Sequence, residues 1–282
     1  MARLPNVRLD LSNRPENVLL VREALAGVAE TVGLDGGDLS DIRTAATEAC
    51  NNVVLHAYSG DPGALEIEIE LAGASTSVTV RDHGVGISRD GVSPEEQSGE
   101  GGGIGLPVIE ALTRSVEFAE PAGGGTEVRM VFATPGAREL PAATAQVLEL
   151  PVLAEVDGAT AMTVSVAPTE LAKAVIPRLL CVLAARANFS TDRISDSQLL
   201  ADALVAHAAG SLSGTHLSMA VNVEPRDLEL RVGPLIAGRA QGLLVDSDVQ
   251  GLGRVLEKLA DSHGVSSAGS HDTLTLQLLD RR

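Results

Sequence analysis

The stretch that decides the fold is Thr44-Ala-Ala-Thr-Glu-Ala-Cys-Asn-Asn-Val-Val-Leu-His-Ala-Tyr58. We expect it to form one helix, because Ala, Leu and Glu favour helices and no Gly or Pro interrupts the run. Glu48, Asn52 and His56 recur at every fourth position, so their side chains stack on one face. The other positions are mostly apolar, so this polar stripe is narrow, with Asn51 beside it. Such a stripe indicates either a helix that lines a polar cavity or a half-buried helix whose few polar groups reach solvent.

Three glycine-containing turns follow this helix in the chain. The first comes directly after the strand-like residues 76–80 and reads Arg81-Asp-His-Gly-Val-Gly-Ile87. The second, Gly99-Glu-Gly-Gly-Gly-Ile-Gly105, precedes the helix-like residues 106–112. The third, Gly123-Gly-Gly-Thr126, leads directly into a strand-like segment. Glycine allows close backbone approach at each turn, so the turns can surround a ligand.

The order of these features resembles that of a known family. An Asp-x-Gly sequence is ordinary in tight turns, and a glycine-rich run can be a linker. Together, however, a Glu/Asn helix, Asp-x-Gly-x-Gly, Gly-x-Gly at a helix start and Gly-Thr before a strand resemble the four nucleotide-binding boxes of the GHKL ATPase superfamily. The resemblance covers roughly residues 8 to 134. Within this superfamily, the sequence of residues 47–58 is most similar to that of the bacterial anti-sigma-factor serine kinases.

The resemblance implies a site for ATP and Mg²⁺. Asp82 would accept a hydrogen bond from the adenine amino group, and Thr126 would reach the adenine edge with its hydroxyl. Asn52 would bind the Mg²⁺, and Glu48 would accept the proton of the attacking water or hydroxyl. The positions expected to let the backbone approach the nucleotide are Gly84, Gly86, Gly101, Gly102, Gly103 and Gly105. The sequence contains no Gly-Lys-Ser/Thr and no Gly-x-Gly-x-x-Gly in this run, so a P-loop or dinucleotide fold is not indicated.

Two further polar residues have alternative interpretations. The anti-sigma kinases have an Arg in the first helix that contacts partner proteins, and Arg22 matches it approximately. Alternatively, Arg22 is a solvated residue that pairs with Glu23 or Glu16. His56 is either a satisfied structural histidine or a polar group behind the site.

The composition limits the classes of partner. The chain has 282 residues, 44% hydrophobic but 1% aromatic, so its cores must be aliphatic and two domains are expected. Lys and Arg number 21 against 38 Asp and Glu, a formal net charge of −17. Because the sequence has no run of Lys or Arg residues, direct binding to nucleic acid or to an anionic membrane is not expected. A basic partner protein, in contrast, would be attracted by the negative charge of the chain.

The same chain favours a cytoplasmic location. Its first residues lack the apolar segment of a secretory signal. The most apolar later run, residues 174–187, contains a proline and two arginines, so a membrane span is not expected. The two cysteines, Cys50 and Cys181, fit buried free thiols rather than a disulfide framework.

Local patterns predict an α+β fold around the central helix. Residues 7–11 alternate as a first strand, and a helix follows to about Val32, where Gly33 ends it. Ser40 or Asp41 can cap the helix that contains Glu48.

Beyond the central helix, residues 64–71 and 76–80 read as a hairpin. Helices on one face of an antiparallel sheet give a two-layer α/β sandwich, which is the histidine-kinase-like ATPase fold of the GHKL superfamily. Residues 88–103 are polar and occupy the place of the family's ATP lid.

The second half of the chain weakly repeats the first. We expect a nucleotide-binding domain over residues 1–134, a Pro/Ala-rich linker over 135–150 and a degenerate copy over 151–282, with a generic second α+β domain as the alternative. When the copies are aligned, Ala203 takes the place of Glu48 and His207 that of Asn52, and Val232 takes the place of Asp82. The second copy therefore keeps the fold without the site.

The resemblance implies that the first domain is an anti-sigma factor and a serine/threonine protein kinase. It would hold a sigma factor inactive and transfer the γ-phosphate of Mg·ATP to an anti-sigma-factor antagonist. The second domain would be a scaffold or dimerisation surface, giving a homodimer or an intramolecular pseudo-dimer. The alternative is a nucleotide-gated binding protein that sequesters its partner without phosphorylating it.

Overall fold

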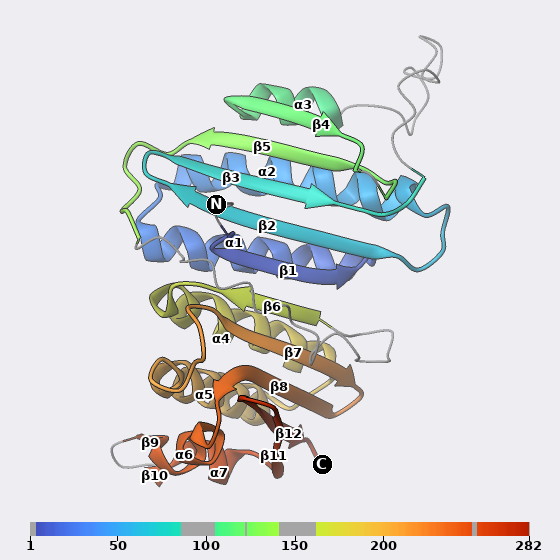
Figure 1. Ribbon diagram of the computed structural model, residues 1–282. Coiled ribbons are helices and arrows are strands. Elements are labelled where there is room, and N and C mark those ends of the chain that lie inside the picture. The colour runs from blue at the N-terminus through green and yellow to red at the C-terminus, as the bar shows by residue number, and fades with distance from the viewer. Residues whose placement is uncertain (1–3, 86–104, 122, 141–161, 250–252, 282) are drawn as a thin grey trace.

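The computed structural model describes residues 4–85, 105–121, 123–140, 162–249 and 253–281. It is a two-layer α+β structure in which helices cover one face of a 10-stranded antiparallel sheet (Figure 1). This confirms the predicted fold class.

The elements follow in chain order. The first half contains β1 (Val7–Ser12), the 3-10 turn η1 (Pro15–Asn17), α1 (Val18–Val32), α2 (Gly36–Asn52), the π-helical turn η2 (Val53–Ala57), β2 (Ala64–Ala72), β3 (Ser75–Arg81), α3 (Gly105–Leu112), β4 (Ser115–Ala119) and β5 (Glu127–Ala133). The second half contains β6 (Met162–Val166), α4 (Thr169–Arg186), α5 (Thr191–Ala208), β7 (Leu217–Glu224), β8 (Asp227–Ile236), α6 (Arg239–Asp246), β9 (Asp248–Val249), β10 (Gly253–Arg254), α7 (Val255–Leu259), β11 (Ser262–Ala268) and β12 (His271–Leu279).

Most predicted elements of the first half are confirmed. β1 alternates buried and partly exposed residues, and β2 and β3 form the expected antiparallel hairpin. α1 ends where predicted, because Gly33 adopts a left-handed conformation (φ 72°) and donates its N–H to the Ala29 carbonyl. The short edge strand β4 was not among the predicted elements, although its Val116 and Phe118 alternate with polar or small residues and are partly buried against the core.

The central helix starts earlier than predicted. α2 begins at Gly36, and its N-cap is Asp35 rather than Ser40 or Asp41. The Asp35 carboxylate accepts a hydrogen bond from the backbone N–H of Asp38 at 2.8 Å. An N-cap residue is extended, as Asp35 is, and its side chain satisfies a free N–H of the first turn. This cap offsets the low helix propensity of the two glycines that follow it.

The far end of this helix is also not regular. The prediction of one helix over residues 44–58 is wrong beyond Asn52, because the chain continues as the π-helical turn η2. In that turn the carbonyl of Ala57 accepts a hydrogen bond from the N–H of Val85 at 2.9 Å. A π turn is defined by its i→i+5 backbone hydrogen bonds, and the residue types at positions 53–57 are all tolerated in an α-helix, so the sequence does not distinguish the two.

The two halves of the sheet meet at β1 and β6. The strand order is β11-β12-β8-β7-β6-β1-β2-β3-β5-β4, while β9 and β10 form a separate two-stranded sheet. Reading outward from the centre, each half presents its strands in the same sequence, and each places two long helices, α1 and α2 or α4 and α5, on the same face (Figure 1). One hydrophobic core includes buried residues of both halves. The halves therefore form a single packed unit.

Polar contacts also join the halves at the centre of the sheet. Asn6 is buried, donates from Nδ2 to the Ala167 carbonyl at 3.1 Å and accepts at Oδ1 from the Leu71 N–H at 2.8 Å. Arg178 of α4 pairs with Glu30 of α1 at 2.6 Å. These contacts fix the register between β1 and β6 and the placement of α4 beside α1.

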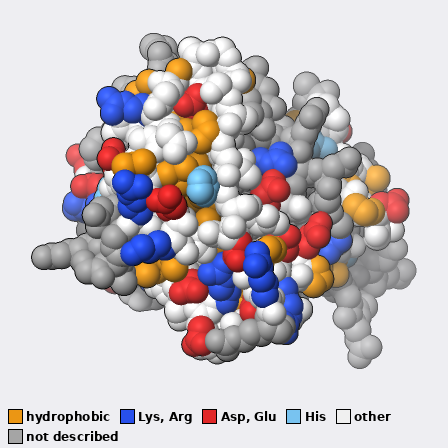
Figure 2. All heavy atoms as spheres, turned by 90° about the horizontal axis from the view of Figure 1, so that it is seen from below, with side chains coloured by type: hydrophobic (Ala, Val, Ile, Leu, Met, Phe, Trp, Pro, Cys, Tyr) orange, Lys and Arg blue, Asp and Glu red, His pale blue; other side chains and the backbone are white. Residues whose placement is uncertain are grey.

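No helix in the described ranges is long and apolar enough to span a membrane. Seen from the end formed by β11, β12, α6 and α7, the surface intersperses acidic and basic side chains with small hydrophobic areas (Figure 2).

Of the two free cysteines, Cys50 is buried as predicted, whereas Cys181 is partly exposed.

Candidate nucleotide-binding site

α2 and α3 bring two of the predicted site residues together. Glu48 and Asn52 lie one turn apart on α2, and Gly105, the first residue of α3, packs against both. A Cβ at Gly105 would lie 3.2 Å from Oε2 of Glu48 and 3.5 Å from Oδ1 of Asn52. A Cβ at this position would require the Glu48 carboxylate to shift by a few tenths of an ångström, whereas its contact with Asn52 would be of ordinary length, so Gly105 lies directly against both polar groups.

Two further predicted residues meet at the ends of β3 and β5. Asp82 follows β3, Thr126 precedes β5, and the N–H of Asp82 donates to the Thr126 carbonyl at 2.9 Å. Both residues are buried, with Asp82 2% exposed. Oδ1 of Asp82 accepts from the N–H of Gly84 at 2.8 Å, which holds the carboxylate in place. A second carboxylate oxygen remains able to accept a hydrogen bond from a ligand.

Glycines are required by close backbone contacts around Asp82. A Cβ at Gly84 would lie 1.9 Å from the Ala57 carbonyl oxygen. A Cβ at Gly125, whose φ is +90°, would lie 2.1 Å from the Asp82 carbonyl oxygen. Real Cβ atoms do not approach backbone this closely, so both positions exclude other residues. The Asp82 turn is thereby clamped between η2 and the turn before β5.

Tyr58 and His83 support the same turn, and neither was among the predicted site residues. Tyr58 Oη donates to the Ala64 carbonyl at 2.7 Å and accepts from the His83 N–H at 2.8 Å. His83 Nε2 lies 2.7 Å from Oε1 of Glu66 on β2. The available signal was weak: Tyr58 is the only tyrosine and directly follows the central helix.

Glu66 has a perturbed acidity in this network. Burial raises the pKa of its carboxyl, but the hydrogen bond from His83 and the positive charges of Arg8 and Arg81 outweigh burial, so the net pKa is lowered. Glu66 therefore stays ionised beside His83 at neutral pH.

The remaining predicted residues are placed differently. Gly86, Gly101, Gly102 and Gly103, with the predicted lid over 88–103, lie outside the described residues. His56 is exposed on η2, which contradicts the interpretation as a satisfied structural histidine.

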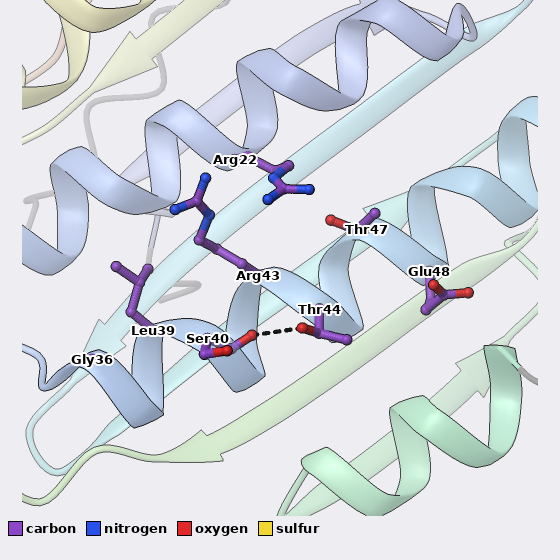
Figure 3. A pocket seen from close by; sticks show the side chains of 8 residues that line it. All are labelled: Arg22, Gly36, Leu39, Ser40, Arg43, Thr44, Thr47 and Glu48. Atoms are coloured by element: carbon purple, nitrogen blue, oxygen red, sulfur yellow. Dashed lines mark hydrogen bonds between the residues drawn. The ribbon is translucent and has the colours of Figure 1, made fainter.

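Arg22 is exposed on α1, where it lines a cavity that ends at Glu48 (Figure 3). Within the described part of the chain it pairs with neither Glu23 nor Glu16, because those carboxylates lie against Arg43 and Arg14.

The donor set fits Mg²⁺ held largely by a nucleotide. The described residues contain no cluster of three or more His, Cys, Asp or Glu side chains suited to a metal ion. Mg²⁺ usually takes most of its ligands from phosphates and water, with one or two protein oxygens. Asn52 would supply such an oxygen beside the start of α3, where the backbone N–H groups of a helix N-terminus favour phosphate.

The corresponding places in the second half are different. Counted from the N-cap residue of each helix, Ala203 in α5 stands at the position of Glu48, and His207 at that of Asn52, as the sequence alignment predicts. Ala203 is buried, and Nδ1 of His207 lies 2.9 Å from the Ala203 carbonyl. Ala203 thus offers no carboxylate where Glu48 stands, and His207 carries an imidazole where Asn52 offers an amide oxygen.

The match at Asp82 needs correction. The β2–β3 and β7–β8 hairpins both have a two-residue turn, so the first residues of β3 and β8, Ser75 and Asp227, correspond. Counting seven residues on from each places Pro234, not Val232, at the position of Asp82. The sequence alignment matched two arginines and slipped by two residues. Such a slip preserves the alternation of a strand, so the hydrophobic pattern does not reveal it.

Fold and site together define an ATPase domain of the histidine kinase type. Residues 11–132 match the family model described as histidine kinase-like ATPase domain. A serine-protein kinase RsbW of Bacillus cereus (strain AH820) is 30% identical over 132 residues, which cover 44% of this chain and 82% of that protein. The RsbW of Bacillus thuringiensis (strain Al Hakam) is 29% identical over 133 residues, with the same coverage. The chain belongs to the histidine kinase-like ATPase family, which confirms the resemblance to the GHKL superfamily.

A solved structure, crystal form III of TP0453, aligns with 100% of this chain and 96% of its own, at a TM-score of 0.33 and 9% identity. That similarity is too low to indicate a shared fold.

Proposed function

We propose that this protein is a cytoplasmic anti-sigma factor and a serine/threonine protein kinase that uses Mg·ATP. It would sequester a sigma factor and phosphorylate an anti-sigma-factor antagonist, and so regulate transcription. The observation that supports this best is the placement of Glu48 and Asn52 beside Gly105 at the start of α3. The similarity of the first half to RsbW serine-protein kinases points to the same activity.

Each residue has a distinct role in this proposal. Asp82 accepts a hydrogen bond from the adenine amino group at the end of β3, and Thr126 borders the adenine from β5. Asn52 supplies an oxygen to Mg²⁺, which when bound neutralises charge on the phosphates of ATP. As the γ-phosphate is transferred to the hydroxyl oxygen of the substrate, Glu48 accepts the proton of that hydroxyl.

Asp82→Asn tests nucleotide binding. Asn keeps an oxygen that can accept from the Gly84 N–H but loses the charge, so we expect affinity for Mg·ATP to fall about tenfold to a hundredfold. Calorimetric titration of the full chain with Mg·ATP and Mg·ADP measures this. Asp61→Asn, at an exposed residue outside the site, is the matched control. Unchanged binding in Asp82→Asn would remove the adenine role.

Glu48→Gln separates a kinase from a sequestering protein. We expect phosphoryl transfer to fall by about 10² to 10⁴-fold with Mg·ATP affinity little changed, because a general base acts on the reaction and not on nucleotide binding. If the variant regulates its partner in cells as the parent does, the nucleotide-gated sequestering function is correct instead.

For the second half we propose a degenerate copy of the ATPase domain. It has the same strand order and covers the β1 edge and the α1 face of the first half, the place where a second protomer would pack. We therefore expect a monomer in solution, with the second half as scaffold. A solution mass of two chains joined through their first halves would contradict this.

A further inference from the structure

The helix α6 lies in the connection between β8 and α7 of the second half. Apart from α6 and the short strands β9 and β10, the second half has the same order of elements as the first: a strand, two long helices, a hairpin, a short helix and two paired strands. The elements α5, β8, α7 and β12 therefore correspond to α2, β3, α3 and β5.

The helix α6 packs among these four elements of the second half, since it contacts α5, β8, α7 and β12. Figure 1 shows α6 next to α7 at the end of the sheet, beyond β8. The corresponding elements of the first half hold the candidate site: Glu48 lies on α2, Asp82 follows β3, Gly105 begins α3 and Thr126 precedes β5. Thus α6 lies where the first half has its candidate nucleotide-binding site.

One side of α6 is part of the hydrophobic core. Ala240, Leu243 and Leu244 are at most 2% exposed and belong to the core cluster. The residues at the other positions, such as Arg239 and Val245, are exposed. Because burying apolar side chains stabilises a fold, α6 fills a space between α5 and the sheet that would otherwise be open to solvent.

An aspartate stands at the second half's counterpart of Thr126. The strands β5 and β12 end at Ala133 and Leu279, which pair with the first residues of β3 and β8. Counting back seven residues from each places Asp272 at the position of Thr126. Asp272 is 2% exposed, so its carboxylate needs partners inside the protein.

These partners tie Asp272 to the start of α6. Its Oδ2 accepts a hydrogen bond at 2.7 Å from the N–H of Gly238, the N-cap residue of α6. Its Oδ1 accepts a hydrogen bond at 2.7 Å from the hydroxyl of Ser267 on β11. A carboxylate beside a helix N-terminus satisfies free N–H groups and interacts favourably with the helix dipole. Asp272 thereby fixes the first turn of α6 against β11 and β12.

We propose that α6 is a built-in occupant of the second half's nucleotide position, held there by Asp272. The inference rests on the proposed degenerate copy and adds what fills its site. The apolar side of α6 takes the place of a bound nucleotide, so the second half keeps its closed packing whether or not ATP is present. It can then support the first half at any ATP concentration.

Photolabelling of the full chain with Mg²⁺ and 8-azido-ATP, followed by peptide mapping, tests where nucleotide binds. We expect labelled peptides from the first half alone, and one Mg·ATP site per chain by calorimetry. A labelled peptide from residues 227–279 of the parent protein would overturn the inference, because α6 and a nucleotide cannot occupy the same space.

Asp272→Ala tests how α6 is held. Hydrogen exchange of residues 239–246 should become about tenfold to a hundredfold faster, because a buried acceptor for the first turn is lost. The affinity of the first half for Mg·ATP should stay within about twofold, since the two sites are far apart. Asp246→Ala, at an exposed residue of the same helix, is the control and should change neither. Unchanged exchange of α6 in Asp272→Ala would overturn the inference.

A second pair of variants keeps the test valid if Asp272→Ala does not fold. Leu244→Ala leaves space under α6 and should also speed the exchange of residues 239–246, whereas Val245→Ala, at the exposed neighbour, should not. Equal exchange of α6 in both variants would mean that α6 does not depend on this packing, which overturns the inference.

The outcomes separate the inference from the proposed function. A labelled second site that appears only when α6 is released supports α6 as the occupant and contradicts the degenerate site. If no form of the protein binds Mg·ATP, the proposed kinase fails. The exchange of α6 in the four variants then still decides whether Asp272 and the apolar side of the helix hold it in place.

Discussion

Gly27 of α1 packs directly on the backbone of Ala174 in α4. A Cβ at Gly27 would lie 2.7 Å from the Ala174 carbonyl oxygen and 3.0 Å from the Cα of Val175. The contact is made by backbone on both sides, so neither side can yield by a side-chain rotation. Gly27 thus sets the distance between the first helices of the two halves.

Gly27→Ala should therefore destabilise the protein. Overpacking a close contact costs about 1 to 3 kcal/mol, which exceeds the gain of up to about 1 kcal/mol from replacing glycine inside a helix. Denaturant unfolding of the full chain measures the difference. Gly36→Ala is the control, because nothing lies within 4 Å of its Cβ position, and it should be neutral or slightly stabilising. Equal effects of both substitutions would contradict the role of Gly27.

Tyr58→Phe tests the support of the Asp82 turn. The substitution removes a donor to the Ala64 carbonyl and an acceptor for the His83 N–H while keeping the ring. We expect a loss of about 1 to 2 kcal/mol of unfolding free energy and a several-fold loss of Mg·ATP affinity, because Asp82 directly precedes His83. Thermal unfolding with and without Mg·ATP checks both. A stability loss without any change in nucleotide binding would limit Tyr58 to a structural role.

The first half could largely be predicted from its sequence because its signals are local and consistent. Alternation marks β1 and the β2–β3 hairpin, and Gly33 marks the end of α1. The positions of Glu48 and Asn52 follow from helix periodicity alone. Where two local signals compete, prediction failed: Asp35 and Ser40 can both cap a helix, and only packing decides between them.

The second half shows what local patterns leave undetermined. The two-residue slip that placed Val232 at the Asp82 position keeps every buried residue on the same face. The cavity beside Arg43 also has no sequence signal, because Arg22 and Arg43 come from different helices. Their proximity depends on how α1 packs on α2.

Two neighbouring carboxylates of β2 should respond oppositely to pH. The net pKa of Glu66 is lowered, as described above, whereas burial dominates at Glu68 and raises the pKa of its carboxyl despite Arg81 and Arg8. A lowered folded-state pKa gives stability that is present above the unfolded pKa and lost as pH falls through the folded pKa. A raised folded-state pKa destabilises the folded protein above the unfolded pKa, so its contribution lowers stability as pH rises.

Glu66→Gln should consequently flatten the rise of stability with pH between about pH 3 and 6, and Glu68→Gln should steepen it. Each effect should be of the order of 1 kcal/mol or less, because the partners Arg8 and His83 are substantially exposed. Unfolding free energies from urea titrations at a series of pH values provide the test. Slopes that change in the same direction in both variants would refute the assigned signs.

The two cysteines should differ in reactivity while the protein is folded. Cys50 lies on α2 with 0% exposure, and burial raises the pKa of its thiol to about 12. Burial and the charge of Asp202 also raise the pKa of Cys181, but its side chain is partly exposed on α4. Because the thiolate is the reactive form, iodoacetamide at pH 8 should modify Cys181 slowly and Cys50 only after unfolding.

Mass spectrometry of the intact chain should thus show one label on the native protein and two in denaturant. Cys181→Ser should leave the native protein unlabelled, and it makes Cys50 a reporter of opening around the central helix. Since α2 packs between α1 and α3 in the core, labelling of Cys50 should then follow the unfolding equilibrium. Labelling of Cys50 as fast as of Cys181 in the native protein would mean that α2 opens locally, beside Glu48, without unfolding of the whole.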